Sequence, residues 1–240
     1  MQRLLTPLIL LAAPTMTASA QGQTPTTVYG ASWADIAAVS AAGATALLPV
    51  LLKLPSGAPS CAPCDPAGLP GIDRWVVGQH SSLAQTGSNA LLLGVGGMSA
   101  VLTLHDLNAA QERGNLAVLA NSVTWTAAST QWIKVLVRRK RPVLYTSGAT
   151  AAAPSPDSQR SFPSSHTSLA FSVATSYLVM ARREHLPHRA RNALLLYAGA
   201  AGVGALRVAG GDHFPTDVIG GAALGTAVGW LVATLHPHTP

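Results

Sequence analysis

The chain has 240 residues, of which 48% are apolar and only 10% charged, and its formal net charge is +6. Soluble domains carry about 25% charged residues, so most of this chain avoids water. A membrane protein explains this better than a soluble bundle rich in Ala and Gly. The basic residues are few and clustered, which argues against the spread footprint of a nucleic-acid-binding protein. They indicate a local anion site or a loop that faces a membrane.

Residues 1–20 have the features of an export signal. Arg3 is their only charge, residues 4–13 form an apolar run, and Ala18-Ser19-Ala20 resembles an A-x-A cleavage site. An uncleaved anchor is the alternative. We expect the remaining residues, 21–240, to form one helical domain.

Cys61 and Cys64 form a C-x-x-C pair within a stretch rich in Pro, Gly and Ser, from Pro55 to Gly71. A zinc site would need a second cysteine pair, and a redox motif would need a βαβ pattern around it; the sequence has neither. Beside an export signal, a structural disulfide in an oxidising compartment is the better interpretation. We expect it to pin a loop and to take no part in catalysis.

Six apolar stretches lack the alternation of strands and are long enough for helices. They are residues 36–52, 90–104, 116–137, 167–181, 193–206 and 218–235. The sequence therefore predicts an all-α bundle of six main helices. Several stretches have about 15 residues, roughly 23 Å of helix against a hydrocarbon core of about 30 Å, so they span a bilayer only with help from their flanks. Closely spaced Gly and Ala suit tight packing in lipid; close packing in a soluble bundle is the alternative.

The connection at residues 182–192 is the main clue to orientation, because it carries Arg182, Arg183, Arg189 and Arg191. The positive-inside rule places it in the cytoplasm and the cysteine loop in the periplasm. If residues 1–20 were cleaved and all six stretches spanned, the arginines would fall outside. Three explanations stay open: an uncleaved signal, a first stretch that does not span, or a protein that does not span at all.

Cations collect at the end of the third stretch. Lys134 and Arg141 are seven residues apart, or two helical turns, so we expect both of them and Arg138 on one face of a helix that Pro142 stops. Arg offers a planar fork of donors that matches phosphate oxygens, and Lys offers a point charge. This pattern predicts a phosphate site; a solvated basic rim is the alternative.

The segment Ser161-Phe162-Pro163-Ser164-Ser165-His166 is expected to open the fourth helix, because Pro and Ser favour helix starts. Free backbone N–H groups at a helix start bind anions, and a histidine in the first turn would contact such an anion. The positive end of the helix lowers the pKa of that histidine and helps it to give up a proton. An ordinary cap with an incidental histidine is the alternative.

His213 lies six residues after Arg207 and four before Asp217. Pro215 can open the sixth helix, and Asp217 in its first turn can then accept a hydrogen bond from His213 Nδ1, which aims Nε2 outward and makes it a better nucleophile. A structural hydrogen bond is the alternative, and Asp212 could tune the histidine. With the cations and His166, this set suits phosphoryl transfer through a covalent intermediate without a metal or cofactor.

Three motifs stand in order along the chain: Lys134-x₆-Arg141-Pro142, Pro163-Ser164-Ser165-His166 and Arg207-x₅-His213-x₃-Asp217. They resemble the signature of the type 2 phosphatidic acid phosphatase family, which also includes bacterial class A acid phosphatases and vanadium haloperoxidases. The resemblance covers residues 134–217. It implies these roles: Lys134, Arg141 and Arg207 bind phosphate oxygens, Ser164 and the backbone N–H of Ser165 add hydrogen bonds, His213 attacks phosphorus, Asp217 orients it, and His166 protonates the leaving oxygen.

Two positions depart from the family pattern. Ser165 stands where Gly is usual, which would cost strain if the backbone there needed a conformation that favours Gly. Leu206 stands where a serine is usual, which would remove a phosphate contact. Neither departure touches the nucleophile, its orienting carboxylate or the acid.

We therefore expect a metal-independent phosphatase in an inner membrane, with its active site facing the periplasm and a lipid phosphate or prenyl diphosphate as substrate. A soluble, periplasmic acid phosphatase of broad specificity is the first alternative. A vanadate-dependent haloperoxidase is disfavoured by the short chain, and a non-catalytic anion-binding or transport protein by the intact set of His166, His213 and Asp217. His236 and His238 are predicted to belong to a disordered tail.

Overall fold

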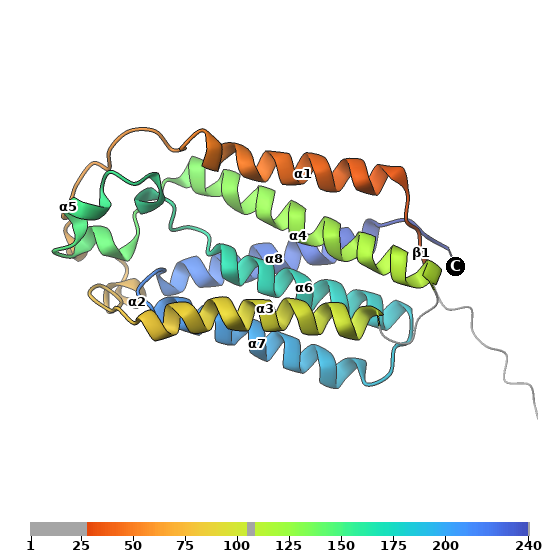
Figure 1. The fold of residues 1–240 in the computed structure, drawn as a ribbon. Helices are drawn as coiled ribbons and strands as arrows, with labels where there is room; N and C mark the ends of the chain where they lie inside the picture. Colours follow the sequence, from red (N-terminus) through yellow and green to blue (C-terminus); the bar gives the residue numbers. More distant parts are fainter. Residues whose placement is uncertain (1–27, 105–108, 240) are drawn as a thin grey trace, which may run out of the picture.

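The computed structural model describes residues 28–104 and 109–239, which form a bundle of long helices whose axes lie along one direction (Figure 1). The long helices are α1 (Trp33–Leu51), α3 (Ser82–Leu104), α4 (Ala109–Val137), α6 (Ser165–Arg183), α7 (Arg189–Ala209) and α8 (Pro215–Leu235). Each contains one of the six predicted stretches, except that Leu52 follows α1 as its C-cap. The all-α prediction is confirmed. Residues 1–20, with the predicted export signal, lie outside the described residues.

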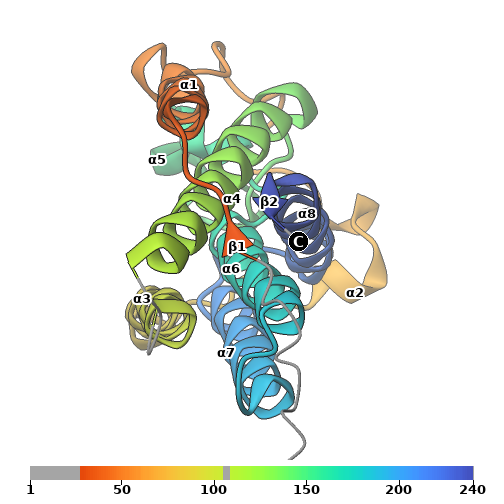
Figure 2. The same ribbon diagram turned by 90° about the vertical axis from the view of Figure 1, so that its right-hand side faces the viewer.

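Helix α6 is the centre of the bundle and packs against α3, α4, α7 and α8, whereas α1 lies outside and packs on α4 (Figure 2). Its inward faces bury Ala174, Tyr177 and Met180 completely. Apolar burial of this kind supplies most of the stabilisation of such a bundle. A central α6 also means that the residues at its start are surrounded by the ends of several other helices.

The seam between α6 and α8 is unusually close. Glycines on α8, four residues apart, face backbone carbonyl groups on α6, also four residues apart. The pairs are Gly221 with Ser164, Gly225 with Ser168, and Gly229 with Ser172. A Cβ atom at Gly225 would lie only 2.0 Å from the Ser168 carbonyl oxygen. Any larger residue would therefore push the two helices apart.

Much of the outer surface is apolar. Trp33, Leu93 and Leu194 are strongly exposed large side chains on three different helices. Four helices are long and apolar enough to cross a membrane, namely α1, α3, α7 and α8. Helices α4 and α6 are not among these four. An exposed apolar surface that extends over several helices is typical of contact with lipid.

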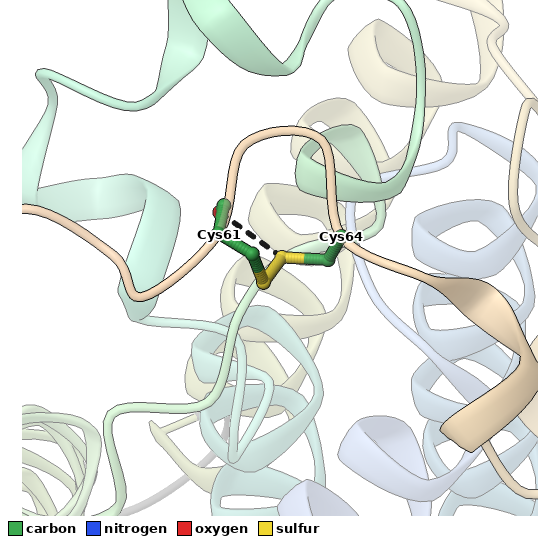
Figure 3. The surroundings of a disulfide bond; sticks show 2 residues. All are labelled: Cys61 and Cys64. Carbon is green, nitrogen blue, oxygen red and sulfur yellow. Dashed lines mark hydrogen bonds between the residues drawn. A yellow bond between two sulfur atoms is a disulfide. The ribbon is translucent and has the colours of Figure 1, made fainter.

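At the end where α6 and α8 begin, here called the loop end, two long connections meet (Figure 1). The α1–α3 connection contains η1 (Pro66–Gly68) and α2 (Gly71–Arg74); the α4–α6 connection contains η2 (Pro142–Tyr145), α5 (Ala149–Ala152) and η3 (Pro156–Gln159). In the first of them, Cys61 and Cys64 form a disulfide with a Cα–Cα distance of 5.0 Å (Figure 3). The Cys64 backbone N–H donates to the Leu144 carbonyl at 2.8 Å, which ties the two connections together.

At the opposite end, here called the terminal end, β1 (Val28–Tyr29) pairs antiparallel with β2 (His238–Thr239) (Figure 2). The Tyr29 hydroxyl donates to the Ala233 carbonyl at 3.0 Å, and His236 Nε2 bonds the Gly30 carbonyl at 2.8 Å. The prediction of a disordered tail is therefore wrong for His236 and His238. The buried Tyr29 ring and the strand pairing hold this segment against the bundle, which local composition did not reveal.

Candidate functional site

All eight residues that the motifs singled out lie at the loop end. Lys134 comes from the last turn of α4, Arg141 precedes η2, and Ser164, Ser165 and His166 form the start of α6; Arg207 comes from the last turn of α7, His213 precedes α8, and Asp217 lies in its first turn. The structure brings these groups together around His213. Arg141, Lys134, Arg207 and His166 all lie close enough to it for their charges to lower its pKa.

The route of the chain after α4 differs from the prediction. The helix ends at Val137, and Arg138 adopts a left-handed backbone with φ of 52°. Its guanidinium therefore points away and donates to the Ser56 carbonyl at 2.8 Å. The expectation that Arg138 shares one helical face with Lys134 and Arg141 is wrong. Arg141 reaches the site from the connection instead, where it donates to the Asp212 carbonyl at 3.2 Å.

Lys134 is 3% exposed, and its Nζ donates to the Arg160 carbonyl at 2.6 Å. Burial, followed by the neighbouring Arg141 charge, lowers the pKa of Lys134 to about 7. Burial disfavours the charged ammonium because water no longer solvates it. An anion bound beside Lys134 would restore the charged form, so this lysine suits a phosphate site.

The start of α6 is a regular helix start. Ser164 is the N-cap, with φ −70° and ψ 115°, and Ser165 is the first helical residue. The left-handed non-glycine residues in the described ranges do not include Ser165, so the expected strain is absent. The Ser164 N–H donates to the Asp217 carbonyl at 3.0 Å and thereby ties the start of α6 to α8.

His166 is held by a residue that the motifs did not include. Its Nε2 lies 2.7 Å from Oδ1 of Asn89 on α3, so the ring donates there. Burial, followed by the charges of Arg207, Arg141 and Lys134, lowers the pKa of His166 to about 4. A dianionic phosphate among these cations would raise that pKa again. His166 is thus placed to exchange a proton with a group bound in this cluster.

Arg207 forms an ion pair with Asp212, with 3.0 Å between its Nη1 and Asp212 Oδ2, and donates to Ser88 Oγ at 3.3 Å. Its buried Nε has no partner. The sequence suggested that Asp212 could tune His213; in the structure its carboxylate pairs with Arg207. Leu206 lies beside α3 at Gly87.

His213 is 1% exposed, and its Nδ1 lies 3.5 Å from Asp217 Oδ2. This is a close contact, but Nδ1 has no hydrogen bond, so the predicted Nδ1–Asp217 hydrogen bond is not formed. Asp217 Oδ2 accepts instead from Ser161 Oγ at 2.6 Å and from the Phe214 N–H at 2.9 Å. Burial, followed by the Arg141 and Lys134 charges, holds the pKa of His213 far below its usual range, which keeps the imidazole neutral.

Two further residues belong to the surroundings of Asp217 and were missed from the sequence: Arg139 contacts it directly, and Asp73 contacts Arg139. Arg139 donates to Asp217 Oδ1 at 2.5 Å and to Asp73 Oδ2 at 2.6 Å. A run of basic residues around Arg139 was visible, but nothing in the sequence distinguished it from Arg138. Asp73 lies in a connection far from the motifs, and only the folded chain brings it to the site.

A comparison with protein families gives a match over residues 115–239, to the PAP2 superfamily. The chain belongs to the PAP2 superfamily. Membership implies a phosphatase, an enzyme that hydrolyses phosphoryl groups, and agrees with the resemblance of the three motifs. No curated protein and no solved structure matches the chain. Asp73, Ser88 and Asn89 lie outside the matched residues.

Proposed function

We propose that this PAP2 protein hydrolyses a phosphate ester through a phosphohistidine on His213, with His166 as general acid. One observation carries the proposal: the buried His213 imidazole precedes α8, where Lys134, Arg141 and Arg207 lie close enough to lower its pKa. A neutral imidazole is a nucleophile, and preorganised cations stabilise the charge of a phosphoryl transition state.

The geometry supports a division of roles. Nδ1 of His213 faces Asp217, which leaves Nε2 to attack phosphorus. The bond from phosphorus to the leaving oxygen then breaks, and the protonated His166 imidazole supplies the proton to that oxygen. Water next attacks the phosphohistidine, His166 takes up a proton from it, and inorganic phosphate leaves. Lys134, Arg141 and Arg207 hold the phosphoryl oxygens, with Ser164 and the Ser165 N–H, throughout both steps.

The location in an inner membrane, with the site facing the periplasm, rests on the positive-inside rule. The four arginines of residues 182–192 lie around the α6–α7 connection at the terminal end, opposite the site. A cytoplasmic terminal end places the loop end and its disulfide in the periplasm. Helix α1 also begins at the terminal end (Figure 1), which would place its first residues in the cytoplasm if α1 spans.

A lipid phosphate as substrate is supported by an apolar cavity of about 490 Å³ beside the residues that lead to His213. Its walls come from α2, α7 and α8 and include Trp75, Val208 and Ile219. An acyl or prenyl chain could lie there while its phosphate reaches His213.

A second candidate, a phosphatase of broad specificity for polar esters, is favoured by a polar cavity of about 550 Å³. It is lined by Arg141 and Asp212 of the site itself, together with His80, Gln85 and Asp157. A small hydroxylated leaving group would find hydrogen-bond partners there.

Phosphate release tests both proposals. Detergent-purified protein is assayed in excess EDTA on phosphatidic acid, a prenyl diphosphate and an aryl phosphate, as wild type, His213→Ala and the control His185→Ala, an exposed histidine at the terminal end. We expect wild type and the control to turn over and His213→Ala to lose activity about 10⁴-fold or more. Equal activity of wild type and His213→Ala would overturn the mechanism. A preference for the aryl phosphate would favour the second candidate.

A further inference from the structure

We infer that Arg139 and Asp73 are positioning residues for the reaction: together they hold Asp217, and through it the nucleophile, although neither belongs to the three motifs. This inference rests on the proposed function, since it concerns how the carboxylate beside His213 is kept in place. It also gives the connection between α1 and α3 a part in positioning the catalytic groups.

The first observation is the bridge itself. One guanidinium lies between two carboxylates, with Arg139 Nη1 2.5 Å from Asp217 Oδ1 and Arg139 Nη2 2.6 Å from Asp73 Oδ2. Both aspartate side chains are 0% exposed, and that of Arg139 is 21% exposed. Arg139 Nη1 also bonds Thr216 Oγ1 at 2.6 Å. Both Nη atoms are therefore engaged by groups of the protein itself.

The second observation is the stack on Phe214, the residue directly after the nucleophile. The Arg139 guanidinium carbon lies 4.7 Å from the centre of the Phe214 ring. Tyr145 packs edge-on against the same ring, with 5.9 Å between the centroids, and Phe214 is fully buried. A guanidinium fixed by its ion pairs and by an aromatic face cannot turn without moving the backbone beside His213.

The third observation is the grip of Asp73 on the first turn of α8. Asp73 Oδ1 accepts from the Thr216 N–H at 3.1 Å, and Oδ2 accepts from Thr216 Oγ1 at 2.7 Å. The adjacent Arg74 anchors this loop by donating to the Ala67 and Leu69 carbonyls at 2.8 and 3.0 Å. Asp73 thus supplies an acceptor to a free N–H at the start of the helix that carries Asp217.

These contacts divide the work around Asp217. Ser161 and the Phe214 N–H hold one carboxylate oxygen, and Arg139 holds the other. Without the Arg139 charge, two buried carboxylates would stand without a cation, and a buried carboxylate in that state takes up a proton or turns toward water. Asp217 would then no longer support positive charge on His213 as phosphorus is attacked.

The test uses the isosteric variant Asp73→Asn in the full-length, detergent-purified protein, with Arg139→Lys and Arg139→Gln beside it. Asp65→Asn, an exposed acid in the same connection, and Arg138→Gln, the exposed neighbouring arginine, are the matched controls. We expect kcat to fall about 100-fold in Arg139→Gln, as for a misplaced catalytic group, and less in Asp73→Asn. Arg139→Lys should recover part of that loss because it keeps the positive charge. The recovery should be incomplete because a point charge cannot bridge both carboxylates.

The decisive measurement is a split between turnover and anion binding. Because neither residue touches the phosphate, the dissociation constant for tungstate should stay within about twofold of wild type while kcat falls. A purely structural role would lower the melting temperature and leave the kcat of folded protein unchanged.

Each result has one meaning. Wild-type kcat in both Asp73→Asn and Arg139→Gln, with His213→Ala inactive, would overturn this inference and leave the proposed function standing. Equal losses of tungstate affinity and kcat would also overturn it, by making Arg139 a phosphate ligand. If His213→Ala kept wild-type activity, the proposed function would fail first. If Arg139→Gln does not fold, Asp73→Asn and Arg139→Lys decide the question.

Discussion

The loop end and the terminal end of the bundle differ in which buried atoms lack a hydrogen-bond partner. In the described ranges, the unpaired buried side-chain nitrogens are all at the loop end: Arg160 Nε, Arg207 Nε and His213 Nδ1. Unpaired buried oxygens occur at both ends: Ser158 Oγ and Asp212 Oδ2 at the loop end, and Asn115 Oδ1 and Glu184 Oε1 at the terminal end. Arg183, by contrast, donates to the Ala233 and Thr234 carbonyls at the end of α8.

This difference indicates what each end is built to accept. Unsatisfied buried donors are costly; His213 Nδ1 faces Asp217, whereas Arg207 Nε would be satisfied by an anion bound in the site. At the terminal end, a proton on Glu184 can supply the missing hydrogen bond, because a protonated carboxyl is a donor. Burial raises the pKa of Glu184 to about 7, although its hydrogen bond from Asn115 lowers it. The loop end is thus adapted to a ligand and the terminal end to stability.

The largest expected effect concerns the loop end. Replacing His166 with Ala removes the proton donor and should slow turnover about 10²–10⁴-fold. With an aryl phosphate, whose leaving group needs little protonation, phosphohistidine should then accumulate, because water activation also needs His166. Rapid quench with radiolabelled substrate, followed by a test for an acid-labile and alkali-stable label, measures this. His185→Ala is the control, and a loss below about tenfold would argue against His166 as the acid.

A smaller effect should appear in anion affinity. Because the pKa of Lys134 is about 7 in the free protein, the lysine is neutral above that pH and must take up a proton when an anion binds. Tungstate affinity should therefore fall as pH rises through about 7, by at most about tenfold per pH unit. Lys134→Arg should remove this dependence, since Arg stays charged.

Lys140→Arg is the control for that titration. Isothermal calorimetry in buffers of different ionisation enthalpy reports the proton uptake directly. Equal proton uptake in wild type and Lys134→Arg would mean that another group titrates, and the donor surplus at the loop end would then need a different account.

The smallest effect concerns stability at the terminal end. A carboxyl whose folded-state pKa is about 7, raised from its usual value of 4.5, binds more protons in the folded state than in the unfolded state between these values. Stability should thus fall as pH rises from about 5 to about 7 and level off above that. Glu184→Gln should flatten this slope and raise the melting temperature at pH 8, because the amide donates without a charge.

Thermal unfolding by circular dichroism in detergent checks this prediction, with Glu112→Gln, an exposed acid, as the control. A slope that persists in Glu184→Gln would assign the pH dependence to other groups. Activity should be unchanged at saturating substrate, since Glu184 is remote from His213.

The sequence predicted the long elements well because apolar stretches without alternation can be buried in this way only as helices. It failed where tertiary contacts overrule local preference. The turn at Arg138 has a left-handed, non-glycine backbone, which no local signal encodes, and it decides that Arg139 rather than Arg138 reaches Asp217. The strand pairing of Tyr29 with His238 joins the two ends of the described chain, a separation at which sequence patterns carry no information.

The candidate site shows the same limit. Motif residues at helix ends could be named because each has a chemical reason for its position. Asn89 and Asp73 could not, because an amide and a carboxylate in ordinary settings become site residues only through packing of α3 and of the α1–α3 connection.

The glycine seam between α6 and α8 has a consequence for how this protein can diversify. His166 stands at the start of one helix and His213 directly before the other, so the seam fixes the span between acid and nucleophile. Substitutions at Gly221 or Gly225 would alter that distance, so we expect the protein not to tolerate them. New substrate preferences can therefore arise only from elements outside the seam, such as α3, α7 and the two loop-end connections, which can vary while the chemistry stays constant.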